Sequence, residues 1–384
     1  MDTIRPRSAK TVRKLARHLT RRAAFGLGVL VAIGLSCFLL AVAGAWVLVF
    51  GTPTLSVGNA LWHAVVTSLL GWSAFRAASW LIVPAPRAEG VRLDRDNAPS
   101  LFQLVDTLAD RMGAPRVDRI RITADMNAAV HQRPLKGLWG RMETTLVVGL
   151  PLVHSISPKQ LKAILAHEMA HLVRQRHGAL AWDAHLRAWW HRVCERIASD
   201  GSWSARLLTA VLTPWAEAGI MKALELNHLE EYEADRVAAR FIGPKLLGDT
   251  LVEVAMKSEF IEGDYWEKVM AQAEHSPRPT IRPFRDMGMG VAAGFQALPQ
   301  NGLLRSLISE EDGGIMHPTL TDRLVALRVA PRVPARTHKR SAANHYLRPA
   351  LPGLSKRFDG MWWRATRPAW RQYYRQCQSD TDVG

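Results

Sequence analysis

Two histidines and a glutamate stand close together in the stretch His167-Glu168-Met169-Ala170-His171, which has the form H-E-x-x-H. On an α-helix, residues four apart lie on one face, so both imidazoles can reach a single ion. Zinc accepts neutral histidine nitrogens, and a catalytic zinc site keeps one position open for water. A glutamate beside such a site can take a proton from that water. The spacing therefore predicts a zinc site with His167 and His171 as ligands and Glu168 as the general base.

This chemistry requires a helix, and the residues before the motif predict one. Ser157 is a suitable N-cap, Pro158 suits the first helical position, and Gln160 completes a capping box. Gly178 is suited to end the helix. Apolar residues lie on most faces of the intervening helix, which predicts that it is buried. A chance H-E-x-x-H on an ordinary helix is the alternative, because a motif match is only a hypothesis.

An acidic cluster some sixty residues later can complete the zinc site. Two histidines leave the ligand set incomplete, and Glu230, Glu231 and Glu233 are all candidates by chemistry. Glu231 lies four residues before Asp235 and would share a helical face with it. A ligating histidine normally donates its second N–H to a carboxylate or carbonyl, which Asp235 can provide. Spacing alone does not choose among the three glutamates, which also fit a solvated helix face.

The order of three motifs gives the chain a family resemblance. H-E-M-A-H at 167–171, E-Y-E-A-D at 231–235 and H-P-T-L-T-D-R at 317–323 together resemble the HtpX-like and CaaX-prenyl-protease-like family of membrane-anchored zinc metallopeptidases. The resemblance covers roughly residues 90–330. It implies gluzincin chemistry, in which two histidines and one glutamate hold one Zn²⁺ per chain.

The resemblance also implies roles for individual residues. The family's third zinc ligand falls on Glu231, and the aspartate that supports a ligating histidine falls on Asp235. His317 is expected to face the substrate or the developing oxyanion. Asn127 and Ala128 are expected on an edge strand beside the zinc, where an extended peptide can add as a further strand.

The chain departs from the family in its hydrophobic segments. Family members often have more of them, and some lie between the two zinc motifs. Here that insert is interrupted by charges and by Pro214. We therefore expect general membrane-associated proteolysis rather than cleavage of prenylated proteins.

Two uncharged apolar runs near the N-terminus predict a membrane anchor. Residues 23–50 are long enough to span a bilayer, and residues 55–75 form a second run. Basic residues lie outside both runs, which places both chain ends in the cytoplasm. We therefore expect a transmembrane helical hairpin, in a multi-pass protein of the bacterial inner membrane with a cytoplasmic catalytic domain.

The remaining patterns predict an α+β, mainly helical fold, in which a zincin-like metallopeptidase domain with a small sheet follows the hairpin. Helices are expected over 101–112, ended by Gly113, over 229–241, and from His317 onward. Strands are expected at 117–123, 127–131 and 144–148, and a loop at 276–294. The domains expected are a basic N-terminus (1–22), two transmembrane helices (23–83), the metallopeptidase domain (84–330, opening with a linker) and a basic, aromatic C-terminal tail (331–384).

The distribution of charge narrows the class of partner. The formal net charge is +16, of which residues 1–22 carry +7 and residues 331–384 carry +8, leaving +1 for residues 23–330. A nearly neutral centre argues against a nucleic-acid-binding face, whereas basic flanks suit anionic lipid. The three cysteines are scattered and indicate no disulfide framework.

These observations predict a membrane-anchored zinc endopeptidase that acts on membrane-associated or misfolded proteins at the cytoplasmic side. Its expected partners are protein or peptide substrates and the lipid bilayer, without nucleic acid. Nothing in the sequence indicates an oligomeric state. The alternative is a proteolytically silent membrane adaptor that retains the metallopeptidase fold, and the presence of every expected catalytic residue argues against it.

Overall fold

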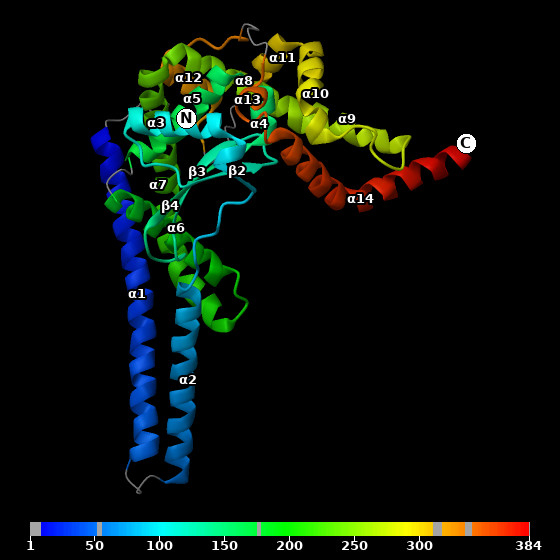
Figure 1. The fold of residues 1–384 in the computed structure, drawn as a ribbon. Coiled ribbons are helices and arrows are strands. Elements are labelled where there is room, and N and C mark those ends of the chain that lie inside the picture. Colours follow the sequence, from blue (N-terminus) through cyan, green and yellow to red (C-terminus); the bar gives the residue numbers. More distant parts are fainter. Residues whose placement is uncertain (1–8, 52–55, 175–177, 310–316, 335–339, 384) are drawn as a thin grey trace.

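The computed structural model describes residues 9–51, 56–174, 178–309, 317–334 and 340–383. Figure 1 shows a mainly helical body from which two long helices, α1 (Ala9–Phe50) and α2 (Val57–Leu81), extend side by side. Among the described helices, α1 is the one long and apolar enough to cross a membrane. Helix α2, which covers the second expected span, lies beside α1 but does not meet that criterion.

The sheet has four strands of mixed direction, in the order β1-β2-β4-β3. The strands are β1 (Val91–Leu93), β2 (Arg119–Thr123), β3 (Ala128–Pro134) and β4 (Met142–Gly149). β2 and β4 pair in parallel, and the other two pairs are antiparallel. The three expected strands are present. The segment expected as a linker contains β1, which at three residues is too short for its alternation to be recognised.

The other elements are α-helices, together with three short helical segments of other kinds. The α-helices are α3 (Pro99–Met112), α4 (Leu150–Ser155), α5 (Pro158–Arg174), α6 (Gly178–Ala198), α7 (Trp203–Ile242), α8 (Pro244–Phe260), α9 (Trp266–Ala271), α10 (Pro283–Ala297), α11 (Gln300–Ser309), α12 (Leu320–Leu327), α13 (Ala342–Tyr346) and α14 (Leu351–Val383). The short segments are Arg95–Asn97 and Gln272–Glu274, both 3₁₀, and Ile261–Tyr265, a π-helix.

Glycine has a different role at each of two expected helix ends. Gly113 ends α3 as predicted and adopts a left-handed conformation, φ 68°, which glycine reaches without a steric penalty. Gly178, expected to end the motif helix, instead begins α6. The motif helix α5 ends at Arg174, and residues 175–177 of the expected last turn lie outside the described residues.

The prediction of a loop at 276–294 is wrong from Pro283 onward, because α10 begins there. Its buried residues Phe284, Met287 and Val291 recur at helical spacing and join the main core. The glycines that suggested a loop are instead sites of close packing. A Cβ added at Gly294 would lie 2.6 Å from the Phe260 ring.

The acidic motif lies within a helix much longer than expected. The helix expected over 229–241 is the second half of α7, which starts at Trp203 and continues through Pro214. The first half of α7 is held by packing, because Leu208, Leu212 and Trp215 contact a cluster that includes residues of α1 and α6. This tertiary support offsets the cost of a proline inside a helix.

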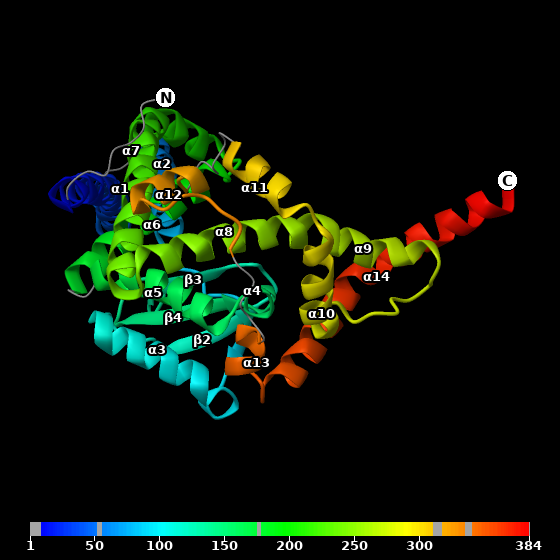
Figure 2. The ribbon, with the colours of Figure 1, turned by 90° about the horizontal axis from the view of Figure 1, so that it is seen from above.

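The C-terminal segment expected as a tail is largely helical. Ala342, Leu347 and Phe358 belong to the main core cluster, so the core extends beyond residue 330. Trp370 of α14 is fully buried and donates from Nε1 to Ser276 O at 2.9 Å. Seen from above, α14 carries the C-terminus away from the end of the molecule where α1 and α2 lie (Figure 2).

Candidate metal centre

Helix α5 carries His167, Glu168 and His171 and is fixed at its start by the expected capping box. Ser157 N donates to Gln160 Oε1 at 2.9 Å, and Gln160 N donates to Ser157 Oγ at 3.3 Å. The helix packs against α3, α7, α8 and β3. The burial of α5 agrees with its apolar pattern. The contacts with these elements fix the direction of the His167, Glu168 and His171 side chains.

Helix α7 crosses α5 and brings Glu231 to the two histidines. The Nε2 atoms of His167 and His171 lie 3.1 Å apart. Glu231 Oε2 lies 3.4 Å from His167 Nε2, and Glu231 Oε1 lies 3.5 Å from His171 Nε2. One ligand atom from each of the three residues lies within 4.8 Å of the others. Two imidazole nitrogens and one carboxylate oxygen form a donor set that suits zinc with an open position.

Asp235 lies one turn further along α7, where it contacts the ring of His167 from behind. Its Oδ1 is 2.9 Å from His167 Nδ1, so the aspartate can orient the imidazole and leave Nε2 directed at the cluster. Ala234, between the two acidic residues of interest, is buried and permits the close approach of the helices.

Arg323 is a further member of the site. It is the last residue of the H-P-T-L-T-D-R motif, and the motif alone indicated no role for it. Its guanidinium donates to both oxygens of Asp235, Nη2 to Oδ1 at 2.7 Å and Nε to Oδ2 at 2.8 Å. Nη2 also lies 3.7 Å from Glu231 Oε2. Arg323 therefore holds both carboxylates of α7 from α12. The signal available in the sequence was an arginine six residues after His317, the histidine of the histidine-proline pair.

His317 lies at the rim of the cluster. Its Nδ1 is 3.6 Å from Glu231 Oε1, and its side chain is 69% exposed. The Glu231 carboxylate, which accepts a hydrogen bond from His317, raises the pKa of His317 above its ordinary value. The residue is placed near the cluster as expected and remains open to solvent.

Glu168 points toward the edge strand β3. The backbone of Val130 hydrogen-bonds to the Glu168 carboxylate, and burial raises the pKa of this carboxyl group to about 7. β3 is the last strand of the sheet and contains Ala128. Asn127 lies just before the strand, where its backbone oxygen accepts from Gly149 N at 2.7 Å. The structure therefore brings the expected edge strand and the motif helix into contact.

The two histidines of the cluster have opposite electrostatic environments. Burial opposes the charged form of His167, but the neighbouring carboxylates of Asp235 and Glu231 outweigh it and raise its pKa to about 9. Burial and the charge of His167 lower the pKa of His171 to about 4.

Arg323→Gln is expected to reduce zinc affinity or catalytic efficiency about 10–100-fold, because the partners that orient ligands typically have effects of this size. Arg323→Lys should restore only part of the loss, since an ammonium cannot reproduce the two parallel hydrogen bonds. Zinc content after dialysis and kcat/KM on an unfolded protein substrate measure both effects. Arg332→Gln is the matched control, because Arg332 forms the same bidentate pair with Asp249 on the surface. Equal losses in Arg323→Gln and Arg332→Gln would contradict the assigned role.

Comparison with known protein families assigns the chain to the metallopeptidases. The model of peptidase family M48 matches residues 97–330, from the start of α3 to the end of α12, and the chain belongs to this family of zinc metallopeptidases. No curated protein and no solved structure matches the chain.

Proposed function

We propose that this protein is a membrane-anchored zinc endopeptidase of the HtpX-like type that cleaves membrane-associated or misfolded proteins at the cytoplasmic face. The observation that carries the proposal is the convergence of His167, His171 and Glu231 within 4.8 Å, beside Glu168. The donor set fits one Zn²⁺, with Asp235 orienting His167. The family membership supports the same class of reaction.

The residues around the cluster account for the steps of peptide hydrolysis. Zinc held by His167, His171 and Glu231 would supply a Lewis acid for the water and the scissile carbonyl. Glu168 accepts the proton of the attacking water and donates it to the leaving amine nitrogen. His317, exposed at the rim, is placed to donate a hydrogen bond to the developing oxyanion.

The edge strand β3 supports a peptide substrate in extended form. It pairs with β4 on one side only, and its backbone at Val130 contacts Glu168. An extended peptide that adds to such an edge gains main-chain hydrogen bonds without a requirement for one sequence. This geometry suits cleavage of unfolded segments with varied side chains.

The exposed apolar surface of the long helices supports membrane anchoring. The side chains concerned are large and more than half exposed: Phe38, Leu39 and Trp46 on α1, and Leu61, Trp62 and Trp72 on α2. Soluble monomers rarely expose a contiguous apolar surface of this extent. The segment between the two zinc motifs forms α6 and α7, which pack against α1. This packing supports general proteolysis rather than a chamber for prenylated proteins.

The purified full-length protein is expected to digest casein, an unfolded substrate, only when zinc is bound. Treatment with a chelator should reduce cleavage to background, and added Zn²⁺ should restore it, because the proposed site has only three protein ligands and exchanges its ion. Peptide products are measured by fluorescence of a labelled casein. Digestion that persists unchanged after removal of all metal would reject the proposed zinc-dependent activity. No digestion even with zinc bound would favour the proteolytically silent adaptor.

The anchored topology predicts that residue 53 and Gly384 lie on opposite sides of the membrane. The motivation is the pair of adjacent apolar helices with basic residues at their outer ends. Reporter fusions that are active on only one side of a membrane measure the position of each point. The same signal from both fusions would exclude a helical hairpin that crosses the bilayer.

A further inference from the structure

A pocket of about 470 Å³ lies between α4, α8, α10 and α13, away from the metal centre. Ser157, which lines it, caps the start of α5, whereas His167 lies ten residues further along, about 15 Å at the rise of an α-helix. The volume is within the range of small-molecule sites, which combine an apolar lining with a few convergent polar groups. The Met256, Val291 and Phe295 side chains supply the apolar part.

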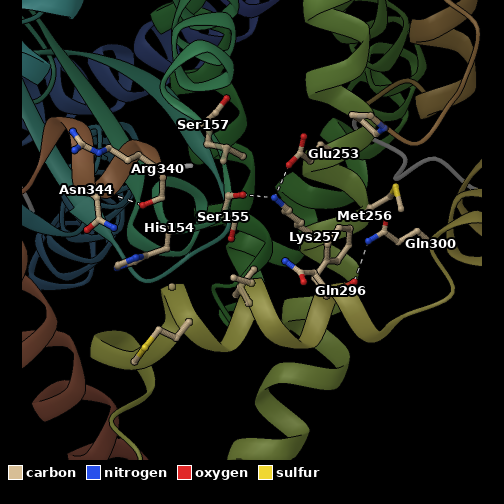
Figure 3. Close-up of a pocket in the computed structure, with 18 of the residues that line it drawn as sticks. His154, Ser155, Ser157, Glu253, Met256, Lys257, Gln296, Gln300, Arg340 and Asn344 are labelled. Atoms are coloured by element: carbon tan, nitrogen blue, oxygen red, sulfur yellow. Dashed lines mark hydrogen bonds and ion pairs between the residues drawn. The ribbon is translucent and has the colours of Figure 1, made fainter. Parts of the chain in front are cut away.

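Three polar side-chain groups without a partner among the described residues lie together on one side of the pocket in Figure 3. They belong to His154, which is partly buried, and to Arg340 and Asn344, which are exposed. His154 Nε2 is buried without a hydrogen bond. A buried polar atom of this kind is rare and calls for a ligand or water that satisfies it. Burial lowers the pKa of His154 to about 4, so its imidazole is neutral at pH 7 and can donate from Nε2.

On the other side of the pocket the charged groups are already paired, whereas the exposed Gln296 amide has no partner among the described residues. Lys257 Nζ donates to Ser155 O and, at 2.5 Å, to Glu253 Oε1, as the dashed lines of Figure 3 show. Glu253 Oε2 accepts from Gln160 Nε2. Glu253 is the only acidic residue among the described residues of the lining, and Lys257 already balances its charge. Among the same residues the unpaired charge is the exposed Arg340 guanidinium, which favours an anion.

The packing of His154 shows that this end of the pocket is built closely. A Cβ added at Gly288 would lie 3.1 Å from His154 Nδ1, so the glycine allows α10 to approach the imidazole. The ring is thereby held between α4 and α10, and its Nε2 atom has no hydrogen-bond partner. Lys257 lies 5.4 Å above the Phe295 ring, which joins the polar network to the apolar wall.

From these contacts we infer that the pocket binds a small organic carboxylate with an apolar body. The carboxylate accepts hydrogen bonds from Arg340, His154 Nε2 and the Asn344 amide, and the apolar body lies on Met256, Val291 and Phe295. This chemistry is shared by a free branched-chain acid and by the carboxyl end of a peptide with an apolar last residue. The inference does not depend on the proposed peptidase activity.

Three probes of closely matched shape test the inference on the full-length protein in detergent. They are 4-methylpentanoate, N-acetyl-leucine and N-acetyl-leucinamide. Binding is followed by the ¹³C-methyl signals of Met256 and Met289, assigned with Met→Leu variants, since both side chains line the pocket.

We expect saturable shifts with a Kd of about 1 mM or tighter for at least one carboxylate. The amide should bind at least about tenfold more weakly. A preference for N-acetyl-leucine indicates a peptide end, and a preference for 4-methylpentanoate indicates a free acid.

Variants then test the groups that recognise the carboxylate. Arg340→Gln and His154→Phe should each weaken binding about tenfold or more, whereas Arg348→Gln, an exposed arginine outside the lining, should not. His154→Phe should also leave the melting temperature of the ligand-free protein undiminished, because Nε2 has no partner to lose. Equal affinity for the acid and the amide, equal affinity in Arg340→Gln and Arg348→Gln, or no saturable shift of Met256 with either carboxylate would overturn the inference.

Discussion

Glu168→Gln is expected to lower casein hydrolysis by about 10²–10⁴-fold, the usual contribution of a positioned general base, while zinc content stays at the wild-type level. Glutamine keeps the size of the side chain and the contact with β3 but cannot accept the proton of the attacking water. The residue lies between the two candidate ligands in sequence but is not a member of the cluster that can hold the ion. Initial rates and metal analysis of the same preparation therefore separate chemistry from metal binding.

A matched substitution shows whether the loss is specific to this carboxylate. Glu267→Gln changes an exposed glutamate on α9 and should leave both the rate and the zinc content unchanged. Near-normal hydrolysis by Glu168→Gln would exclude this residue as the base. Loss of the metal together with the activity would show instead that Glu168 is needed to hold the ion.

Glu231→Ala is expected to remove zinc from the protein after dialysis against a weak chelator, with a loss of affinity greater than about 100-fold. This exceeds the 10–100-fold that residues supporting a ligand typically contribute, because a ligand itself is lost. The expectation comes from the position of the Glu231 carboxylate, whose two oxygens lie 3.4 and 3.5 Å from the two Nε2 atoms. Removal of this side chain would leave only His167 and His171 as ligands, with the rest of the ion open to solvent.

Two neighbours on α7 serve as controls for this assignment. Glu233 is directed toward Arg236, with 3.6 Å between Glu233 Oε1 and Arg236 Nη2, so Glu233→Ala should retain the metal. Asp235→Asn should have the smaller effect of about 10–100-fold, since this residue acts through His167. Zinc retained in Glu231→Ala but lost in Glu233→Ala would mean that α7 is rotated about its axis from the position described.

Local patterns in the sequence were sufficient for the motif helix and for most of the sheet. Ser157 and Gln160 form the expected capping box, and α5 begins at Pro158 as predicted. Caps, turns and periodic apolar residues act over a few positions, so the signal for each is contained within its own segment. The H-E-x-x-H spacing likewise placed two imidazoles on one face, because that geometry depends on the helix alone.

The family resemblance pointed to Glu231 among the acidic residues of α7, but the physical reason for that choice lies in contacts between segments far apart in the chain. Glu230, Glu231 and Glu233 are chemically equivalent, and spacing left the choice open. The crossing of α5 and α7 placed Glu231 against both histidines. Arg323 joins them from α12, almost ninety residues after Asp235. No local pattern encodes such distances, because they arise when separate helices pack.

Packing between separate elements also explains why two segments were misassigned. α10 contains glycines at positions where Phe260 and Tyr265 approach its backbone, so residues typical of loops serve close packing instead. The segment that contains α14 was expected as a basic, aromatic tail rich in proline and arginine, yet Trp370 is fully buried against the body of the protein. The sequence alone thus determined the chemistry of α5 and its local geometry. Tertiary packing decided which distant side chains complete the site, since only burial against other elements could stabilise them there.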